Sequence, residues 1–182
     1  MPKRKIILIT IVIFCAVLFV AGATWALLTA HARPLKNTFT VGNIKLSLVE
    51  TTGESYPMIP GKTVDKNPRV KVFGGSEDCW LFIEVGKTEY FDDYVAYEMD
   101  PEWTRLEGYE NVYYRSVERS ERDTEFRVLL DDTVTVRDTL TEEKMSEITA
   151  PPKMTFKAYA IQSFSISTAA YAWQQILQEV IE

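Results

Sequence analysis

Histidine is almost absent from this sequence. The single histidine, His31, lies near the N-terminus. A zinc site built on two histidines and the H-E-x-x-H arrangement of metallopeptidases are therefore excluded. A Ser-His-Asp or Cys-His catalytic group would depend on that same N-terminal residue. The sequence thus predicts no catalytic residue, no metal ligand and no cofactor, and the protein is not expected to be an enzyme.

Cysteine is nearly as scarce. Cys15 lies in an apolar N-terminal run, which leaves Cys79 alone in the rest of the chain. That part of the chain therefore has no intramolecular disulfide, and its stability must come from packing. Because Cys79 sits in the apolar segment DCWLFIEV, we expect it to be a small buried hydrophobic residue.

Glycine is missing where a phosphate-binding loop would need it. Two Gly-Lys-Thr triplets occur, at 61–63 and 86–88. The P-loop pattern requires a further glycine five positions before the second one, and those positions hold Tyr56 and Leu81. Neither triplet is expected to bind nucleotide.

Three pairs of adjacent acids are present, namely Asp92-Asp93, Asp131-Asp132 and Glu142-Glu143. Neighbouring carboxylates on a strand point to opposite faces, so adjacency alone does not make a catalytic pair. A loop with Asp131-Asp132 would offer oxygen ligands to Ca²⁺, but the EF-hand spacing is absent. We interpret the pairs as surface acids.

The N-terminus has the three-part plan of an export signal. Lys3, Arg4 and Lys5 precede an apolar run with no Asp, Glu, Lys or Arg from 6 to 32, which ends in small residues. The run is also long enough to cross a bilayer, which requires about 20 apolar residues. We expect residues 1–26 to be a signal peptide, or an uncleaved anchor, and residues 27–182 to form a single domain outside the membrane.

Two cleavage positions fit the small residues. The first is the Thr24-Trp25-Ala26-Leu27 segment, with the cut after Ala26. The alternative is a cut after Ala32, because Ala30-His31-Ala32 is also a small-x-small sequence. Both would release a chain that lacks the basic cluster.

The net charge is negative. The whole chain carries −6, and removal of the first 26 residues leaves 17 basic against 26 acidic residues, a net charge of −9. Such a balance favours solubility and disfavours nucleic acid or an anionic membrane surface as a partner. Contact with a membrane is expected only through the N-terminal segment.

Alternation of apolar and polar residues dominates the rest of the chain and is typical of half-buried strands. The segment 37–50 places Ile44, Leu46 and Leu48 on one face, whereas 78–87 is apolar on both faces, as expected of a central strand. Further strands are predicted around Val70 and Val72 and in NVYYRSV, EFRVLL, DTVTVRD and KMTFKAYAIQ. The pattern predicts an all-β protein, a β-sandwich in which helices lie only at the margins.

The C-terminal segment STAAYAWQQILQEVIE predicts a helix. Ser167 or Thr168 would be its N-cap, and Tyr171, Ile176 and Val180 would contribute to its apolar stripe.

Three other segments are less regular. TLTEEKMSEI predicts two turns of helix, and FDDYVAY fits either a helical turn or a strand. RSVERSERDTE is rich in charge and is interpreted as a solvated hairpin tip.

Several segments together resemble one known family. They are GATWA, NTFTVGNIKLSL, MIPGKTVDKNPRVKV, SEDCWLFIEV and the closing FKAYAIQ…AAYAWQQI, in this order along most of the chain. The chain resembles the TasA and camelysin group of exported proteins of Gram-positive bacteria, and it looks like their small clostridial members.

The resemblance implies a fold, a location and a function. The fold would be a jelly-roll-like β-sandwich with short peripheral helices, preceded by an N-terminal signal or transmembrane helix. A signal peptidase of the SipW type would remove the signal, and the protein would be secreted to the extracellular matrix or the cell surface. Members of the group polymerise into biofilm fibres by donating an N-terminal strand, here within Leu27 to Thr40, to the next subunit. The implied partners are the peptidase and either further copies of the chain or a related fibre subunit.

Two other functions remain open. One is an accessory or membrane-anchored surface module that binds or caps fibres made by another subunit. The other is a camelysin-like metallopeptidase, which the scarcity of histidine disfavours.

Overall fold

The computed structural model describes residues 38–52, 58–146, 148 and 151–181, all of which belong to one unit of the chain. The expected signal peptide and its cleavage positions lie outside these residues. The strands are β1 (Thr38–Val41), β2 (Leu46–Val49), β3 (Thr63–Asp65), β4 (Arg69–Val72), β5 (Cys79–Lys87), β6 (Val95–Ala96), β7 (Thr104–Arg105), β8 (Val112–Val117), β9 (Glu125–Arg127), β10 (Thr133–Val136) and β11 (Met154–Gln162). The helices are α2 (Phe91–Tyr94), α3 (Glu142–Ser146) and α4 (Ala169–Ile181), with 3₁₀ turns η1 (Arg119–Glu121) and η2 (Leu130–Asp132).

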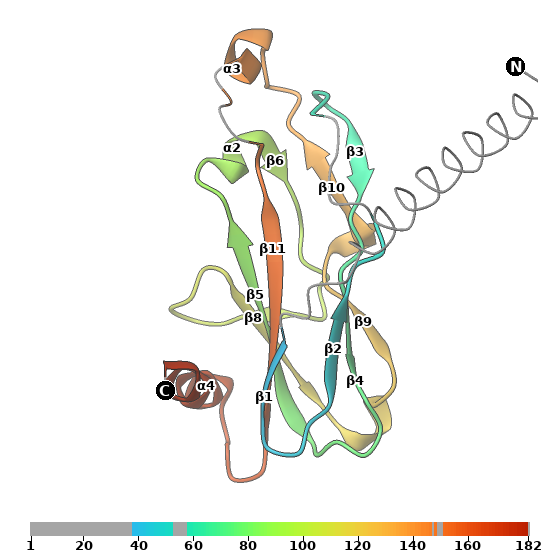
Figure 1. Ribbon diagram of the computed structural model, residues 1–182, viewed down its shortest axis with the longest axis vertical. Helices are drawn as coiled ribbons and strands as arrows, with labels where there is room; N and C mark the ends of the chain where they lie inside the picture. The colour runs from blue at the N-terminus through green and yellow to red at the C-terminus, as the bar shows by residue number, and fades with distance from the viewer. Residues whose placement is uncertain (1–37, 53–57, 147, 149–150, 182) are drawn as a thin grey trace, which may run out of the picture. The chain divides into compact units, whose positions relative to one another are not determined.

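The strands form three sheets (Figure 1). The largest has the order β1-β11-β5-β8-β7, and the two smaller ones have the orders β2-β4-β9 and β3-β10-β6. All pairs in these sheets are antiparallel except β1 with β11, which is parallel. The prediction of an all-β protein with short helices at its margins is therefore confirmed.

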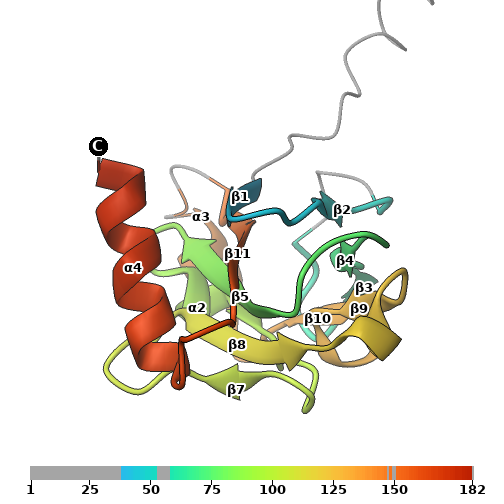
Figure 2. The same cartoon turned by 90° about the horizontal axis from the view of Figure 1, so that it is seen from below.

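Strand β5 lies in the middle of the large sheet and is covered on both faces, as its sequence predicts. Leu81, Ile83 and Val85 point into a core that also receives Val70 of β4 and Phe126 of β9. This core lies between the large sheet and the smaller ones, as Figure 2 shows in the view along the strands.

The outer face of β5 and β11 packs against α4 (Figure 2). Phe82 of β5 contacts Trp173 of the helix at a ring-centroid distance of 5.2 Å, and Tyr159 of β11 contacts Trp173 edge-on at 5.1 Å. The large sheet is therefore the middle layer of the unit.

The predicted C-terminal helix is confirmed as α4, but the residues predicted for its apolar face are only partly correct. Thr168 caps the helix, since its Oγ1 accepts a hydrogen bond from the Tyr171 amide at 3.3 Å. Tyr171 and Val180 are about half exposed, so placing them on the apolar face was wrong. Of the predicted stripe only Ile176 is buried. The helix buries residues at the i, i+3, i+4, i+7 spacing, namely Ala169, Ala172, Trp173 and Ile176.

The segment 37–50 forms the strands β1 and β2, and Ile44, Leu46 and Leu48 face the core together, as predicted. One further interpretation changes. The charge-rich segment RSVERSERDTE is not a hairpin tip, because β8 belongs to the large sheet and β9 to another, so this segment crosses between sheets. The ambiguous FDDYVAY is both α2 and β6, and α3 occupies part of the predicted TLTEEKMSEI helix.

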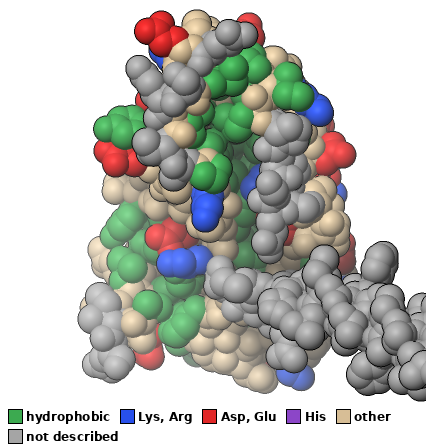
Figure 3. Space-filling view, turned by 45° about the horizontal axis from the view of Figure 1, so that its top comes forward, with side chains coloured by type: hydrophobic (Ala, Val, Ile, Leu, Met, Phe, Trp, Pro, Cys, Tyr) green, Lys and Arg blue, Asp and Glu red, His purple; other side chains and the backbone are tan. Residues whose placement is uncertain are grey.

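Charges on the face seen in Figure 3 are scattered. Acidic and basic side chains alternate with apolar ones there, and neither sign gathers into a broad patch. This distribution fits a hydrated exterior.

Candidate functional site

Strand β1 lies at the margin of the large sheet. It pairs in parallel with β11, from Thr38 opposite Ala158 to Val41 opposite Ile161, and all four of its residues are half-buried. Phe39 reaches the Tyr159 ring, with 6.3 Å between centroids. Residues 38–40, the part of the expected donor that the structure describes, are therefore paired within their own chain.

Gly42 sets where β1 ends. Its φ of +93° lies in the region that favours glycine, and an added Cβ would lie 3.1 Å from Oε1 of Gln162. The chain can thus turn tightly beside the end of β11 and continue to β2.

A hollow of about 590 Å³ lies at the other margin of the large sheet. Its wall includes β9 and η1, together with the turn at 100–102 that precedes β7. The lining residues are Arg69, Asp100, Pro101, Glu102, Ser120, Glu121, Thr124, Glu125, Phe126, Arg127 and Leu130. The hollow is of the size that ligand sites commonly have.

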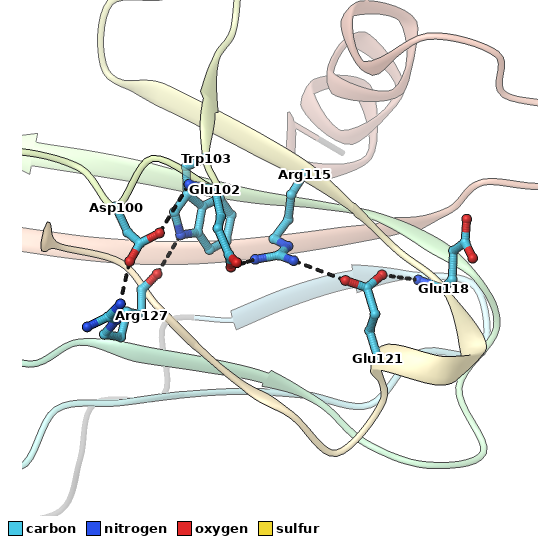
Figure 4. A network of polar contacts seen from close by, with 7 residues as sticks. All are labelled: Asp100, Glu102, Trp103, Arg115, Glu118, Glu121 and Arg127. Atoms are coloured by element: carbon cyan, nitrogen blue, oxygen red, sulfur yellow. Dashed lines mark hydrogen bonds and ion pairs between the residues drawn. The ribbon is translucent and has the colours of Figure 1, made fainter.

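Arg115 of β8 is the central cation behind this hollow (Figure 4). Its guanidinium lies 4.0 Å from the centroid of the Phe126 ring and 5.9 Å from that of Trp103. It donates hydrogen bonds to Glu102 at 2.8 Å and to Glu121 at 3.0 Å. The side chain is only 13% exposed, so one buried cation holds two carboxylates from segments on either side of β8.

A second set of contacts fixes the turn at 100–102 (Figure 4). Trp103 donates its indole N–H to the Arg127 carbonyl at 2.6 Å, and the Arg127 guanidinium lies 3.2 Å from the Asp100 carboxylate. Asp100 is buried, and its carboxylate also accepts a hydrogen bond from the Glu102 amide at 3.1 Å. Polar side chains therefore join the large sheet to the β2-β4-β9 sheet at this margin.

The lining of the hollow has an acidic excess. Four carboxylates line it, from Asp100, Glu102, Glu121 and Glu125, against the guanidinium groups of Arg69 and Arg127. Arg69 already pairs with Asp132. Among the described residues Glu125 has no ion-pair partner, and the residue opposite it in register, Lys71, lies over the Phe73 ring instead. The site therefore favours cationic groups.

Strand β9 is the edge strand of its sheet, and part of its outer edge faces the hollow. The Val128 amide donates to Pro68 on the β4 side, so by alternation the backbone groups of Phe126 also face β4. The backbone groups of Glu125 and Arg127 point away from β4. Of these groups, only the Arg127 carbonyl accepts a hydrogen bond from the Trp103 indole. Just after β9, the Val128 carbonyl accepts a hydrogen bond from the Asp100 amide, so the segment around Asp100 covers the edge at that point.

The acidic pairs of the sequence are not among the residues that line the hollow, although Asp132 binds one of those residues, Arg69. Asp92 binds Lys87 at 2.6 Å, and Asp132 binds Arg69. Glu142 and Glu143 lie in α3. Across 38–52, 58–146, 148 and 151–181, no group of three or more His, Cys, Asp or Glu side chains is placed to hold a metal ion.

Cys79 is buried, as predicted, with 1% of its surface exposed. Burial raises the pKa of its thiol to about 12. The thiol is therefore neutral at physiological pH and a weak nucleophile.

The predicted cleavage residues Thr24, Trp25, Ala26 and Leu27, and the alternative after Ala32, lie outside the described residues. His31 does as well. Of the helices that the structure describes, none combines the length and apolar character needed to cross a bilayer.

Sequence reasoning missed the hollow and its network. A usable signal was present, because Trp103 and Arg115 are the residue types that join in cation–π contacts. Their partners, however, come from separate segments of the chain, and no local spacing links them.

In comparisons with known proteins, no family model, no curated protein and no solved structure matches this chain. Its function is therefore argued from its own residues and geometry.

Proposed function

We propose that this chain is an exported structural subunit that assembles into extracellular fibres by donating an N-terminal strand. The proposal includes a cleaved signal peptide, a location in the matrix or at the surface of a Gram-positive cell, and the jelly-roll-like chain path of the group it resembles. The protein acts by assembly and not by catalysis.

One observation carries the proposal, namely that the described chain begins as an edge strand. Because β1 lies outside β11, residues that precede Thr38 are continuous with the margin of the sheet and not with its core. If such residues pair with another chain, β1 can keep its own pairing with β11. Unpaired strand edges are templates for strands from other molecules.

The position of β1 redefines the donor. Deleting 27–40 would remove most of β1 from its own sheet, including the Phe39 contact with Tyr159. We therefore place the donor in 27–37, which leaves the pairing of β1 with β11 intact.

Electron microscopy and size-exclusion chromatography of two secreted forms test the proposal. Residues 27–182 are expected to form fibres at high concentration, and residues 38–182 are expected to stay monomeric with the same circular dichroism spectrum. Two monomeric forms, or two forms that polymerise equally, would refute assembly by strand donation.

A second function is favoured by the hollow beside β9, which has the size of a ligand site. On this view the chain is a surface-anchored or accessory binding module. N-terminal sequencing of the native protein separates the two, since an intact Met1 indicates a tethered module and a new N-terminus at Leu27 or Arg33 indicates a released subunit.

A further inference from the structure

We infer that the hollow beside β9 is the acceptor for residues 27–37 of a second copy of this chain. The inference rests on the proposed function and names the surface that receives the donated strand. Three observations carry it, concerning backbone edge, charge and position.

The backbone edge comes first. The amide and carbonyl of Glu125 and the amide of Arg127 point away from β4, at the point where the hollow lies. An extended segment laid here would add a fourth strand to β2-β4-β9. Strand β9 has three residues, so at about 3.3 Å per residue the added strand would span about three or four residues.

The charges match. Residues 27–37 read LLTAHARPLKN, with Arg33 and Lys36 as cations and no acid. The hollow presents four carboxylates against two guanidinium groups in its lining, and Arg115 behind the lining pairs with Glu102 and Glu121. Glu125 stands at the open edge without an ion-pair partner among the described residues. Apolar surface from the half-buried Leu130 is available to the leucine that lies between the two cations of the segment.

The position favours a second molecule. Strand β1 is at one end of the order β1-β11-β5-β8-β7, and the hollow is beside the other end. To reach its own hollow the segment would have to pass around the sheet, whose outer face is covered by α4. A donor at one margin and an acceptor at the other give a head-to-tail contact that repeats into a filament.

The first experiment uses a synthetic peptide. A fluorescent copy of residues 27–37, with a photoreactive leucine at position 35, is titrated into the full chain in detergent at low salt. We expect saturable binding, and cross-links in 100–102 and 120–127. Cross-links confined to other segments would overturn the inference.

Charge variants sharpen the assignment. Glu125→Lys is expected to weaken peptide binding about tenfold at low salt, which corresponds to about 1.4 kcal/mol, since it replaces an attraction at the surface by a repulsion. Glu89→Lys is the matched control, because Glu89 is an exposed acid before α2 and does not line the hollow; it should change binding less than twofold. A peptide with Arg33→Glu and Lys36→Glu should bind the Glu125→Lys protein better than the unchanged protein. Equal effects of the two protein variants, with melting temperatures unchanged, would refute the site.

Mixed-isotope cross-linking identifies the occupant. When ¹⁴N- and ¹⁵N-labelled full chains are mixed, links between the N-terminal segment and the hollow should join light to heavy chains. Links within one chain only would show that the segment binds its own hollow.

Microscopy separates this inference from the function it rests on. Fibres that form equally well from the Glu125→Lys protein would leave strand donation in place and exclude this acceptor. Peptide cross-links in the hollow of a protein that never polymerises would retain the site and exclude the fibre function.

Discussion

The two margins of this molecule are closed by different physical means. At the β1 margin, an own-chain strand covers the edge of β11, and nearby aromatic rings pack against α4. At the β9 margin, an arginine between two rings and two carboxylates holds the sheets together, and part of the strand edge has no strand partner among the described residues. Apolar packing stabilises one margin, and charged side chains stabilise the other.

The two kinds of contact differ in how much of a strand edge they leave accessible to a binding partner. Apolar packing removes surface from water and resembles the inside of any domain. Ion pairs between side chains hold the strands in place while backbone groups of the strand edge remain accessible to water. The same charges repel partners of like charge. The edge of β9 is therefore not expected to serve as a general aggregation site.

The largest effect is expected at the apolar margin. Trp173→Ala removes a side chain that is 2% exposed and contacts Phe82, Tyr109 and Tyr159. The free energy of unfolding should fall by about 3–5 kcal/mol, and salt should not restore it. Urea denaturation measures the change. Tyr171→Ala on the same helix, half exposed, should lose less than about 1 kcal/mol; equal losses would mean that α4 does not seal this margin.

The charged margin should be weaker and sensitive to salt. Arg115→Ala leaves Glu102 and Glu121 without their shared cation and removes the contact with Phe126. We expect a loss of about 1–3 kcal/mol, mainly because the stacking of the guanidinium on Phe126 and the packing of the arginine stem are lost, while the two partly exposed carboxylates contribute less. Denaturation at low and high salt measures this loss, which should shrink as salt screens the remaining repulsion.

Arg115→Lys tests whether the shape and hydrogen bonds of the guanidinium stabilise this margin, or its positive charge alone. Lysine keeps the charge but not the planar group that stacks on a ring and donates to two carboxylates. It should recover less than half of the lost stability. Full recovery would show that only net charge matters here, and Arg119→Ala on the exposed side of η1 serves as the neutral control.

The sequence predicts the two margins unequally. The apolar margin follows from local patterns, since β5 is apolar on both faces, the β11 segment alternates, and Thr168 is a typical N-cap. Even there the stripe of α4 was placed wrongly at Tyr171 and Val180, because the helix packs through two small alanines and one tryptophan. Aromatic content alone did not indicate which residues face the sheet.

The charged margin was beyond local patterns. Arg115 looks like the polar member of an alternating strand, and its burial depends on β8 and β9 lying in different sheets. The contacts of Trp103, Arg115 and Phe126 join three segments whose approach is set by the whole fold. The cleavage residues around Ala26 lie outside the described residues and stay predictions.

A smaller effect concerns the attachment of β1. Gly42→Ala forces a Cβ into a left-handed backbone and toward Gln162, so we expect a loss of about 1–2 kcal/mol. Hydrogen exchange of the β1 amides should accelerate. Gly108→Ala has a similar φ of +82° but nothing within 4 Å of its Cβ, and it separates backbone strain from contact. If both variants leave β1 equally protected, Gln162 does not hold the end of the strand.

The smallest effect depends on pH and lies under α4. Burial, and then the hydrogen bond to Glu84 at 2.8 Å, raises the pKa of Tyr159 above its ordinary value near 10. The folded protein therefore keeps this proton where the unfolded chain loses it, so its contribution to stability is complete below pH 10 and declines as the pH rises further. Tyr159→Phe should lose about 1 kcal/mol near pH 8, because the hydrogen bond is gone, and the gap to the unchanged protein should close above pH 10. The raised pKa of Cys79 acts in the same direction in both proteins and cancels in the comparison. Urea denaturation at the two pH values measures the gap, and a gap that widens with pH would mean that the phenol of Tyr159 ionises more readily in the folded protein than in the unfolded one.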